Sequence, residues 1–211
     1  MPPEFPWARF ELGLVLARGV LLVLAEGVLM RLRNSSRSWG LVARALHWII
    51  AVMIVGLFIT GWLAENESNR DASLILLRNH FQFGVILTGL IVMRVLWRLS
   101  DRSPEPLPGE PSWRERMAQS VHGLIYVLLI ILPVAGYIVL VHKKVDMTVF
   151  GLFTVPTLFT PSVEDQGLWA GAWYVHYFAG WILLGLLGLH IGAALFHQFV
   201  LRDGLIRRMT G

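Results

Sequence analysis

The sequence predicts an all-α integral membrane protein, a four-helix bundle with an additional helical extension at its N-terminus. Of its 211 residues, 55% are hydrophobic and only 15% are charged. Four apolar runs are each long enough to cross a bilayer, because a helical span needs about 20 mostly apolar residues. The connections between these runs are too short to hold a sizeable soluble domain. The chain is therefore expected to cross the membrane four times.

Charge and cysteine content narrow the functional classes. The formal net charge is +4, but the basic residues lie beside the apolar runs and are interpreted as topology signals rather than a nucleic-acid surface. The chain has no cysteine, which excludes a Cys-ligated iron–sulfur cluster, a C-x-x-C-H haem attachment and a disulfide. Any redox centre must be held by histidine or methionine.

Residues 1–32 are interpreted as an N-terminal extension. Residues 10–30 are apolar, but charged residues interrupt them, and the small-residue cleavage site of a signal peptide is missing. One interpretation is an interfacial amphipathic helix. The other is a misassigned start, because Met30 begins a basic leader, MRLRNSSRSWG, which suits the cytoplasmic side of a first span. The membrane domain is expected over residues 33–211.

The four predicted spans alternate with polar or proline-rich connections and cover about 41–64, 74–99, 117–141 and 173–200. Pro133 falls inside the third span, where a bundle tolerates the kink it causes. The connection 142–171 is rich in aromatic residues, proline and glycine, and we expect it to lie over the bundle as a partly apolar lid. No Asp or Glu falls inside a span, which weakens a proton-pump or ion-transporter interpretation.

The basic residues at the span ends predict the orientation, because cytoplasmic loops carry the excess of Lys and Arg. One side has four: Arg70, Arg78, Lys143 and Lys144. The other has twelve: Arg31, Arg33, Arg37, Arg44, Arg94, Arg98, Arg102, Arg114, Arg116, Arg202, Arg207 and Arg208. Both termini should be cytoplasmic, and the connection 142–171 should face the periplasm.

Three histidines in the fourth span carry the functional signal. His176 and His190 are fourteen residues apart, which on a helix is about 21 Å of rise and nearly four whole turns. Both imidazoles therefore leave one face at two depths, and His197 follows seven residues later on roughly the same face. A lone histidine in an apolar run is usually a packing residue. Ionisable residues inside a span mark function by default, however, and imidazole is a common axial ligand of haem iron.

Depth sorts the histidines into two pairs. His80, near the outer start of the second span, lies at the level of His176. His47, near the inner start of the first span, lies at the level of His190 and His197, and the residues alone leave open which of these is its partner. Two such pairs between facing helices would hold two b-type haems, one near each membrane surface.

Three further residues have candidate roles at the inner side. Arg94 and Arg44 could bind haem propionates through charge-assisted hydrogen bonds, although both also fit the positive-inside signal. His122, near the inner start of the third span, is interpreted either as a packing residue or as a partner for a propionate or quinone.

Several stretches together resemble the bacterial four-helix cytochrome b561 family. They are ALHW around His47, RNHFQFG around His80 with the downstream VMRVLWRL, SVHGLIYVLLIILPVAGY in the third span, and VHYFAGWILLGLLGLHIGAALFHQF in the fourth. The match covers about residues 33–208. The resemblance implies two haem b groups, with His47 paired to His190 and His80 to His176. It also implies that His122 and His197 are not axial ligands, which leaves His197 free to act near a quinone.

The resemblance further implies a multi-pass protein of the bacterial inner membrane with superoxide oxidase activity, in which electrons pass from periplasmic superoxide to ubiquinone. Cations near the outer haem, such as Lys143 and Lys144, could attract superoxide, although nearby acidic residues oppose a strong field. The alternative function is a cytochrome b subunit that passes electrons between a partner dehydrogenase or hydrogenase and the quinone pool. A third is a haem-free structural or transport protein. Each places the chain in a lipid bilayer, without nucleic acid as a partner.

Overall fold

The computed structural model describes residues 21, 27, 31–161 and 166–210. The predicted extension over residues 1–32 lies outside this part of the chain except for positions 21, 27, 31 and 32. Four long helices follow one another: α2 (Leu41–Asn66), α3 (Arg70–Ser100), α4 (Ser112–His142) and α5 (Gln166–Phe196), which continues as the π-helical turn η1 (His197–Leu201). All four are long and apolar enough to cross a membrane. The predicted helical membrane fold is confirmed in this part of the chain, where four helices are able to cross a bilayer.

The helices extend beyond the predicted spans because an apolar run marks only the part of a helix that meets lipid. The start of α3 illustrates this. Asn69 caps the helix, and its side-chain oxygen accepts hydrogen bonds from the backbone N–H groups of Asp71 and Ala72. Such a cap satisfies amides that have no partner inside the helix, so the first turn forms in polar surroundings. Likewise, α5 begins at Gln166, before its expected start at residue 173.

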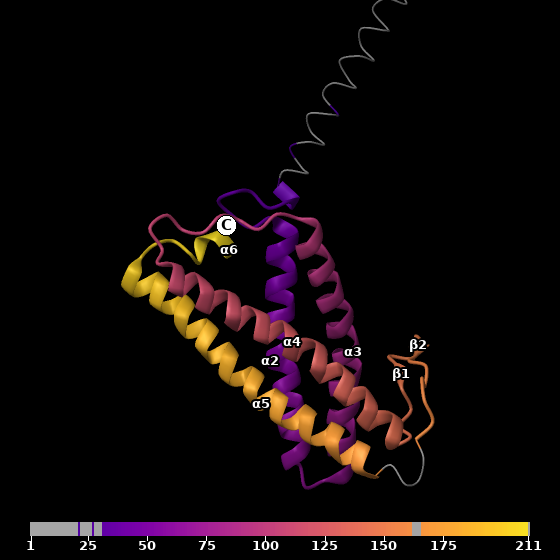
Figure 1. The fold of residues 1–211 in the computed structure, drawn as a ribbon. Coiled ribbons are helices and arrows are strands. Elements are labelled where there is room, and N and C mark those ends of the chain that lie inside the picture. The colour runs from indigo at the N-terminus through magenta and orange to yellow at the C-terminus, as the bar shows by residue number, and fades with distance from the viewer. Residues whose placement is uncertain (1–20, 22–26, 28–30, 162–165, 211) are drawn as a thin grey trace, which may run out of the picture.

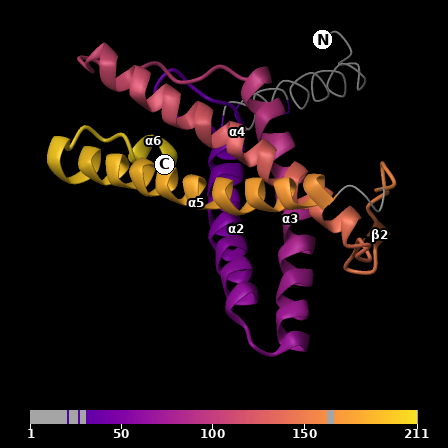
Figure 2. The same cartoon turned by 60° about the horizontal axis from the view of Figure 1, so that its bottom comes forward.

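The four helices form two antiparallel hairpins, α2–α3 and α4–α5, and one hairpin lies across the other (Figure 1, Figure 2). A small shared core near the middle of the helices joins the two hairpins. It consists of Ile50, Leu87, Ile91, Leu129 and Leu183, which come from all four helices. Most other apolar side chains along the helices are exposed, as expected where lipid replaces water. The crossing brings α4 against α3 and places histidine rings of α5 near those of α2 and α3.

The connection after α4 forms a small antiparallel hairpin of β1 (Thr148–Val149) and β2 (Phe153–Thr154). Val149 is only 1% exposed. Gln82 of α3, a buried polar residue, donates from Nε2 to the carbonyl oxygen of Thr148 over 3.3 Å. The ring of Phe83 lies 5.4 Å from that of Phe150. This part of the connection therefore packs against α3.

The opposite end of the bundle is closed by the C-terminal segment, which ends in α6 (Arg207–Thr210). Trp48 of α2 donates from Nε1 to the carbonyl oxygen of Met209 over 3.1 Å. Arg208 donates to the carbonyl oxygens of Arg37 (2.7 Å) and Glu105 (2.6 Å). These bonds join the segment before α2, the α3–α4 connection and the C-terminus in one layer. We call this end, where α2 and α4 begin, the inner end, and the other the outer end.

Candidate haem sites

At the outer end, two imidazoles from different hairpins face each other. His80 of α3 and His176 of α5 are half-buried, with ring centroids 5.9 Å apart and planes inclined by 71°. Each ring is anchored to the partner helix in its own hairpin. His80 Nδ1 donates to the carbonyl oxygen of Leu57 (2.9 Å), and His176 Nδ1 donates to that of Leu132 (2.8 Å). A carbonyl oxygen can only accept, so the proton lies on Nδ1 and the Nε2 lone pair is available to a metal.

At the inner end, three imidazoles converge. His47 of α2 and His190 of α5 have ring centroids 6.2 Å apart, with planes inclined by 69°. His122 of α4 lies nearer to His190, with a centroid separation of 5.0 Å. Both His47 and His190 are half-buried, whereas His122 is exposed. The structure thus brings His122 into the same cluster. Proximity to His190 alone therefore does not identify His47 as its partner.

Arg94 of α3 joins the inner cluster to its surroundings. Its guanidinium donates to Tyr126 Oη of α4 and to the carbonyl oxygen of Ala43 of α2, each over 3.1 Å. Its Nη2 lies 3.3 Å from Nδ1 of His47. Because arginine has only donors, this contact needs a bare Nδ1 on His47, the tautomer opposite to that of His80. The contact has to open before His47 can present a lone pair at Nε2.

Arg44, the second candidate for a propionate, differs from Arg94 in its hydrogen bonding. Its Nε is buried and has no hydrogen-bond partner among the described residues. A buried donor without an acceptor is costly, so this nitrogen is suited to an anionic group supplied from outside the chain.

His197 lies apart from both pairs. Its Nδ1 is 2.5 Å from Oδ2 of Asp203, and an oxygen of Glu110 is close enough to complete a group whose ligand atoms lie within 4.8 Å of one another. Burial raises the pKa of Asp203, but the hydrogen bond from His197 and the bond from the N–H of Leu205 outweigh it, so this pKa lies below its usual value. Asp203 is therefore ionised at neutral pH.

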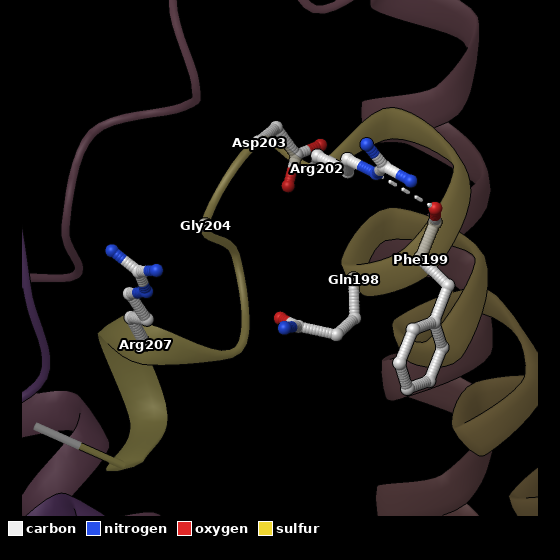
Figure 3. A pocket seen from close by; sticks show the side chains of 6 residues that line it. All are labelled: Gln198, Phe199, Arg202, Asp203, Gly204 and Arg207. Atoms are coloured by element: carbon white, nitrogen blue, oxygen red, sulfur yellow. Dashed lines mark hydrogen bonds between the residues drawn. The ribbon is translucent and has the colours of Figure 1, made fainter.

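A pocket of about 470 Å³ opens beside this pair at the inner end (Figure 3). It follows the π-helical turn η1 and the left-handed residue Arg202 (φ 55°), which turn the chain back on itself. The pocket is lined by Gln198, Phe199, Arg202, Asp203, Gly204 and Arg207. Two arginines, an aspartate and an amide thus line it together with the ring of Phe199.

The spacing of the histidine pairs can be tested against haem. Because an imidazole nitrogen lies about 2 Å from the metal it binds and about 1 Å from the centre of its own ring, two imidazoles on opposite sides of one iron have centroids about 6 Å apart. The separations of 5.9 Å for His80–His176 and 6.2 Å for His47–His190 fit this value, whereas 5.0 Å for His122–His190 is short. The outer pair also fits in tautomer, and the inner pair fits in spacing only. The four axial assignments stay predictions.

A helical membrane protein with imidazole pairs at two depths has the architecture of a membrane-bound b-type cytochrome. The family model described as prokaryotic cytochrome b561 matches residues 38–211. The chain belongs to this family of membrane electron-transfer proteins, which bind haem b. The family predicted from the sequence motifs is confirmed.

Three curated relatives have similar lengths. Cytochrome b561 homolog 2 of Escherichia coli (strain K12) is 30% identical over 86% of this chain and 96% of its own. Cytochrome b561 homolog 1 of the same organism is 26% identical over 78% of this chain and 92% of its own. The protein named "Probable superoxide oxidase CybB" from Yersinia pestis is 25% identical over 78% of this chain and 90% of its own.

Sequence reasoning missed several residues around these sites. Tyr126 gave no signal because one tyrosine in an apolar run resembles any packing residue. Asp203 lies in the basic tail, where its pairing with His197 depends on the turn after α5. The carbonyl oxygens that anchor the outer pair belong to Leu57 and Leu132, and no side chain marks such a role in a sequence.

Proposed function

We propose that this protein is a di-haem superoxide:ubiquinone oxidoreductase of the bacterial inner membrane, with both termini in the cytoplasm. The observation that carries the proposal is the presence of two imidazole pairs near opposite ends of the bundle, His80–His176 and His47–His190, each with a spacing that suits one iron. The name of the Yersinia pestis relative is a second support. In this proposal, His80 and His176 hold the outer haem b, and His47 and His190 hold the inner one.

The reaction balances when two superoxide ions are oxidised for each ubiquinone reduced. Each superoxide ion loses one electron and leaves as O2, so two superoxide ions supply the two electrons that convert one ubiquinone into ubiquinol together with two protons. Haem b supplies one-electron redox chemistry when it is bound. The protein has to admit an anion at one end, and bind a quinone and deliver protons at the other.

The outer end offers exposed cations to superoxide. Lys143 and Lys144 follow α4, and Arg70 begins α3. The Nζ of Lys143 lies 5.4 Å from the ring centroid of Trp169 on α5, which holds this charge near the start of that helix. Acidic residues such as Asp71 lie at the same end, so attraction of the anion should be modest and weaken with ionic strength.

The inner end offers groups for a quinone. His197 lies beside the pocket of Figure 3, where Gln198 and Arg207 lie on opposite sides and can donate to quinone oxygens. His197 can pass a proton to a reduced quinone oxygen while the Asp203 carboxylate fixes its orientation, as carboxylates do for catalytic imidazoles. This arrangement supports the inner end as the site of quinone reduction.

The test measures ubiquinol formation by the purified, haem-loaded protein when an enzymatic source generates superoxide. We expect one ubiquinol for every two superoxide ions, and no reaction once superoxide dismutase is present. His80→Ala should abolish the reaction while retaining the inner haem. Quinone reduction that requires an added soluble dehydrogenase or hydrogenase would instead support the cytochrome-subunit function. No superoxide-dependent ubiquinol in any preparation with two haems would refute the proposal.

A further inference from the structure

Two glycines lie directly against the imidazoles of the outer pair. A β-carbon placed on Gly61 of α2 would lie 3.1 Å from Cε1 and 3.2 Å from Nδ1 of His80. A β-carbon on Gly136 of α4 would lie 3.1 Å from both Cε1 and Nδ1 of His176. The two glycines belong to different hairpins but meet the same pair.

The surroundings of the two glycines repeat from one hairpin to the other. In the first, the carbonyl of Leu57 accepts from His80, and Gly61 follows four residues later. In the second, the carbonyl of Leu132 accepts from His176, and Gly136 again follows four residues later. In an α-helix, residue i+4 lies one turn above carbonyl i and donates its N–H to that oxygen. The imidazole that bonds to carbonyl i therefore has to pass close to the residue at i+4.

A side chain at i+4 would interfere with the ring. Carbon atoms pack best at about 3.5–4.0 Å, so a methyl group at 3.1 Å would have to push the imidazole away. The ring cannot retreat without lengthening a hydrogen bond of 2.8–2.9 Å. Displacing the ring also moves Nε2, the nitrogen that the hydrogen bond at Nδ1 leaves available to a metal.

The same helices contain glycines without this contact. A β-carbon on Gly56 of α2 or on Gly123 of α4 would meet nothing within 4 Å in the described part of the chain. A glycine in these helices therefore need not lie against another group. What distinguishes them is their contact with an anchored imidazole.

We propose that Gly61 and Gly136 are positioning residues of the outer pair, which allow His80 and His176 to reach the Leu57 and Leu132 carbonyls. The hydrogen bonds then fix each ring's tautomer and the direction of Nε2. This inference rests on the proposed role of His80 and His176 as haem ligands.

The test compares Gly61→Ala and Gly136→Ala with the matched controls Gly56→Ala and Gly123→Ala in purified, haem-loaded protein. The haem-to-protein ratio comes from pyridine haemochrome spectra, and potentiometric titration and electron paramagnetic resonance follow each centre separately. We expect both positioning variants to affect the outer centre alone. Its occupancy should fall, taking the ratio from two haems toward one, or its midpoint potential and resonance should shift. The controls should match the unmodified protein.

His80→Ala identifies the outer centre as the one that disappears. The proposal is overturned if a positioning variant behaves like its control, or if both centres change alike, which would indicate a general loss of stability. If His80→Ala and His176→Ala leave both haems in place, the ligand assignment fails and the inference fails with it. If they remove one haem while Gly61→Ala and Gly136→Ala leave that centre unchanged, only the positioning role is refuted.

Discussion

Replacing Arg94 by alanine tests the polar contacts that join the two hairpins at the inner end. The guanidinium of this half-buried residue on α3 donates to Tyr126 on α4 and to the Ala43 carbonyl on α2, each over 3.1 Å. Its third contact is with His47, at 3.3 Å. One side chain thus connects α3 both to its own hairpin partner and to the crossing hairpin.

The expected loss follows from these bonds. A hydrogen bond from a charged donor contributes about 1.5–3 kcal/mol net. For each of the two Arg94 hydrogen bonds we take the lower value, because the residue is only half-buried and the Ala43 carbonyl keeps its partner within α2. The two bonds together then contribute about 3 kcal/mol. In a chain of this size, 1 kcal/mol corresponds to about 2–4 °C, so Arg94→Ala should lower the melting temperature by roughly 6–12 °C.

Arg98→Ala is the matched control, one turn further along α3. The guanidinium carbon of Arg98 lies 5.8 Å from the ring centroid of Trp39 and 5.9 Å from that of Tyr126. These two exposed cation–π contacts contribute about 0.5–1 kcal/mol each, or about 1–2 kcal/mol together, so the control should melt only about 2–8 °C lower. Arg94→Lys should fall between the two, because an ammonium keeps the charge but not the planar fork of donors. Tryptophan fluorescence of the haem-loaded protein in detergent gives each melting temperature. If Arg94→Ala melts no lower than Arg98→Ala, the assignment of these bonds is wrong.

Three other predictions concern the inner end. His47→Ala should reduce the haem count from two to one while His122→Ala keeps both, because the 5.0 Å between the ring centroids of His122 and His190 is short for two ligands of one iron. Pyridine haemochrome spectra measure the haem count. Loss of haem from His122→Ala would contradict the pairing. Tyr126→Phe should lower the melting temperature by less than Arg94→Ala, since it removes one acceptor, and an equal loss would show that the other Arg94 contacts contribute nothing. Asp203→Asn should lower the melting temperature at neutral pH, because the hydrogen bond from His197 holds the folded pKa of Asp203 below the unfolded value of 3.8 despite burial. That stabilisation is present above pH 3.8 and is lost as the pH falls through the lower folded pKa, so melting curves of variant and parent should converge on acidification, and a gap that widens would contradict the assignment.

The fold could be predicted because the signal for a membrane span is local. Each run of apolar residues reports its own environment, whatever the other helices do. Helix ends are different, because they depend on capping groups in the polar layer. The cap at Asn69 lengthens α3 by one turn, and α5 begins seven residues before its apolar run. Neither extension changes the apolar pattern from which the spans were predicted.

The sequence predicts the depth of each candidate histidine in the membrane, but not which neighbouring helix its side chain faces. Alternating span directions put His80 at the level of His176, and their rings do lie together. At the inner end, depth alone could not separate the candidate partners of His47. His197 contacts Asp203 instead, whereas His122 joins the cluster from α4. Which face of a helix meets which neighbour depends on how the hairpins cross, and no local pattern contains that information.

The two ends hold their imidazoles by different means. At the outer end, main-chain carbonyls fix both Nδ1 atoms, so the geometry depends on the helix backbone and on the two glycines that expose it. At the inner end, a side-chain cation, Arg94, contacts His47, and its hydrogen bonds extend to a second hairpin. Substitutions of nearby side chains should therefore leave the outer rings in place unless they add bulk beside them. At both ends the separation of the rings depends on how the hairpins cross, because each pair joins a histidine of α2–α3 to one of α4–α5. At the inner end, Arg94 adds a hydrogen bond to Tyr126 of the crossing hairpin.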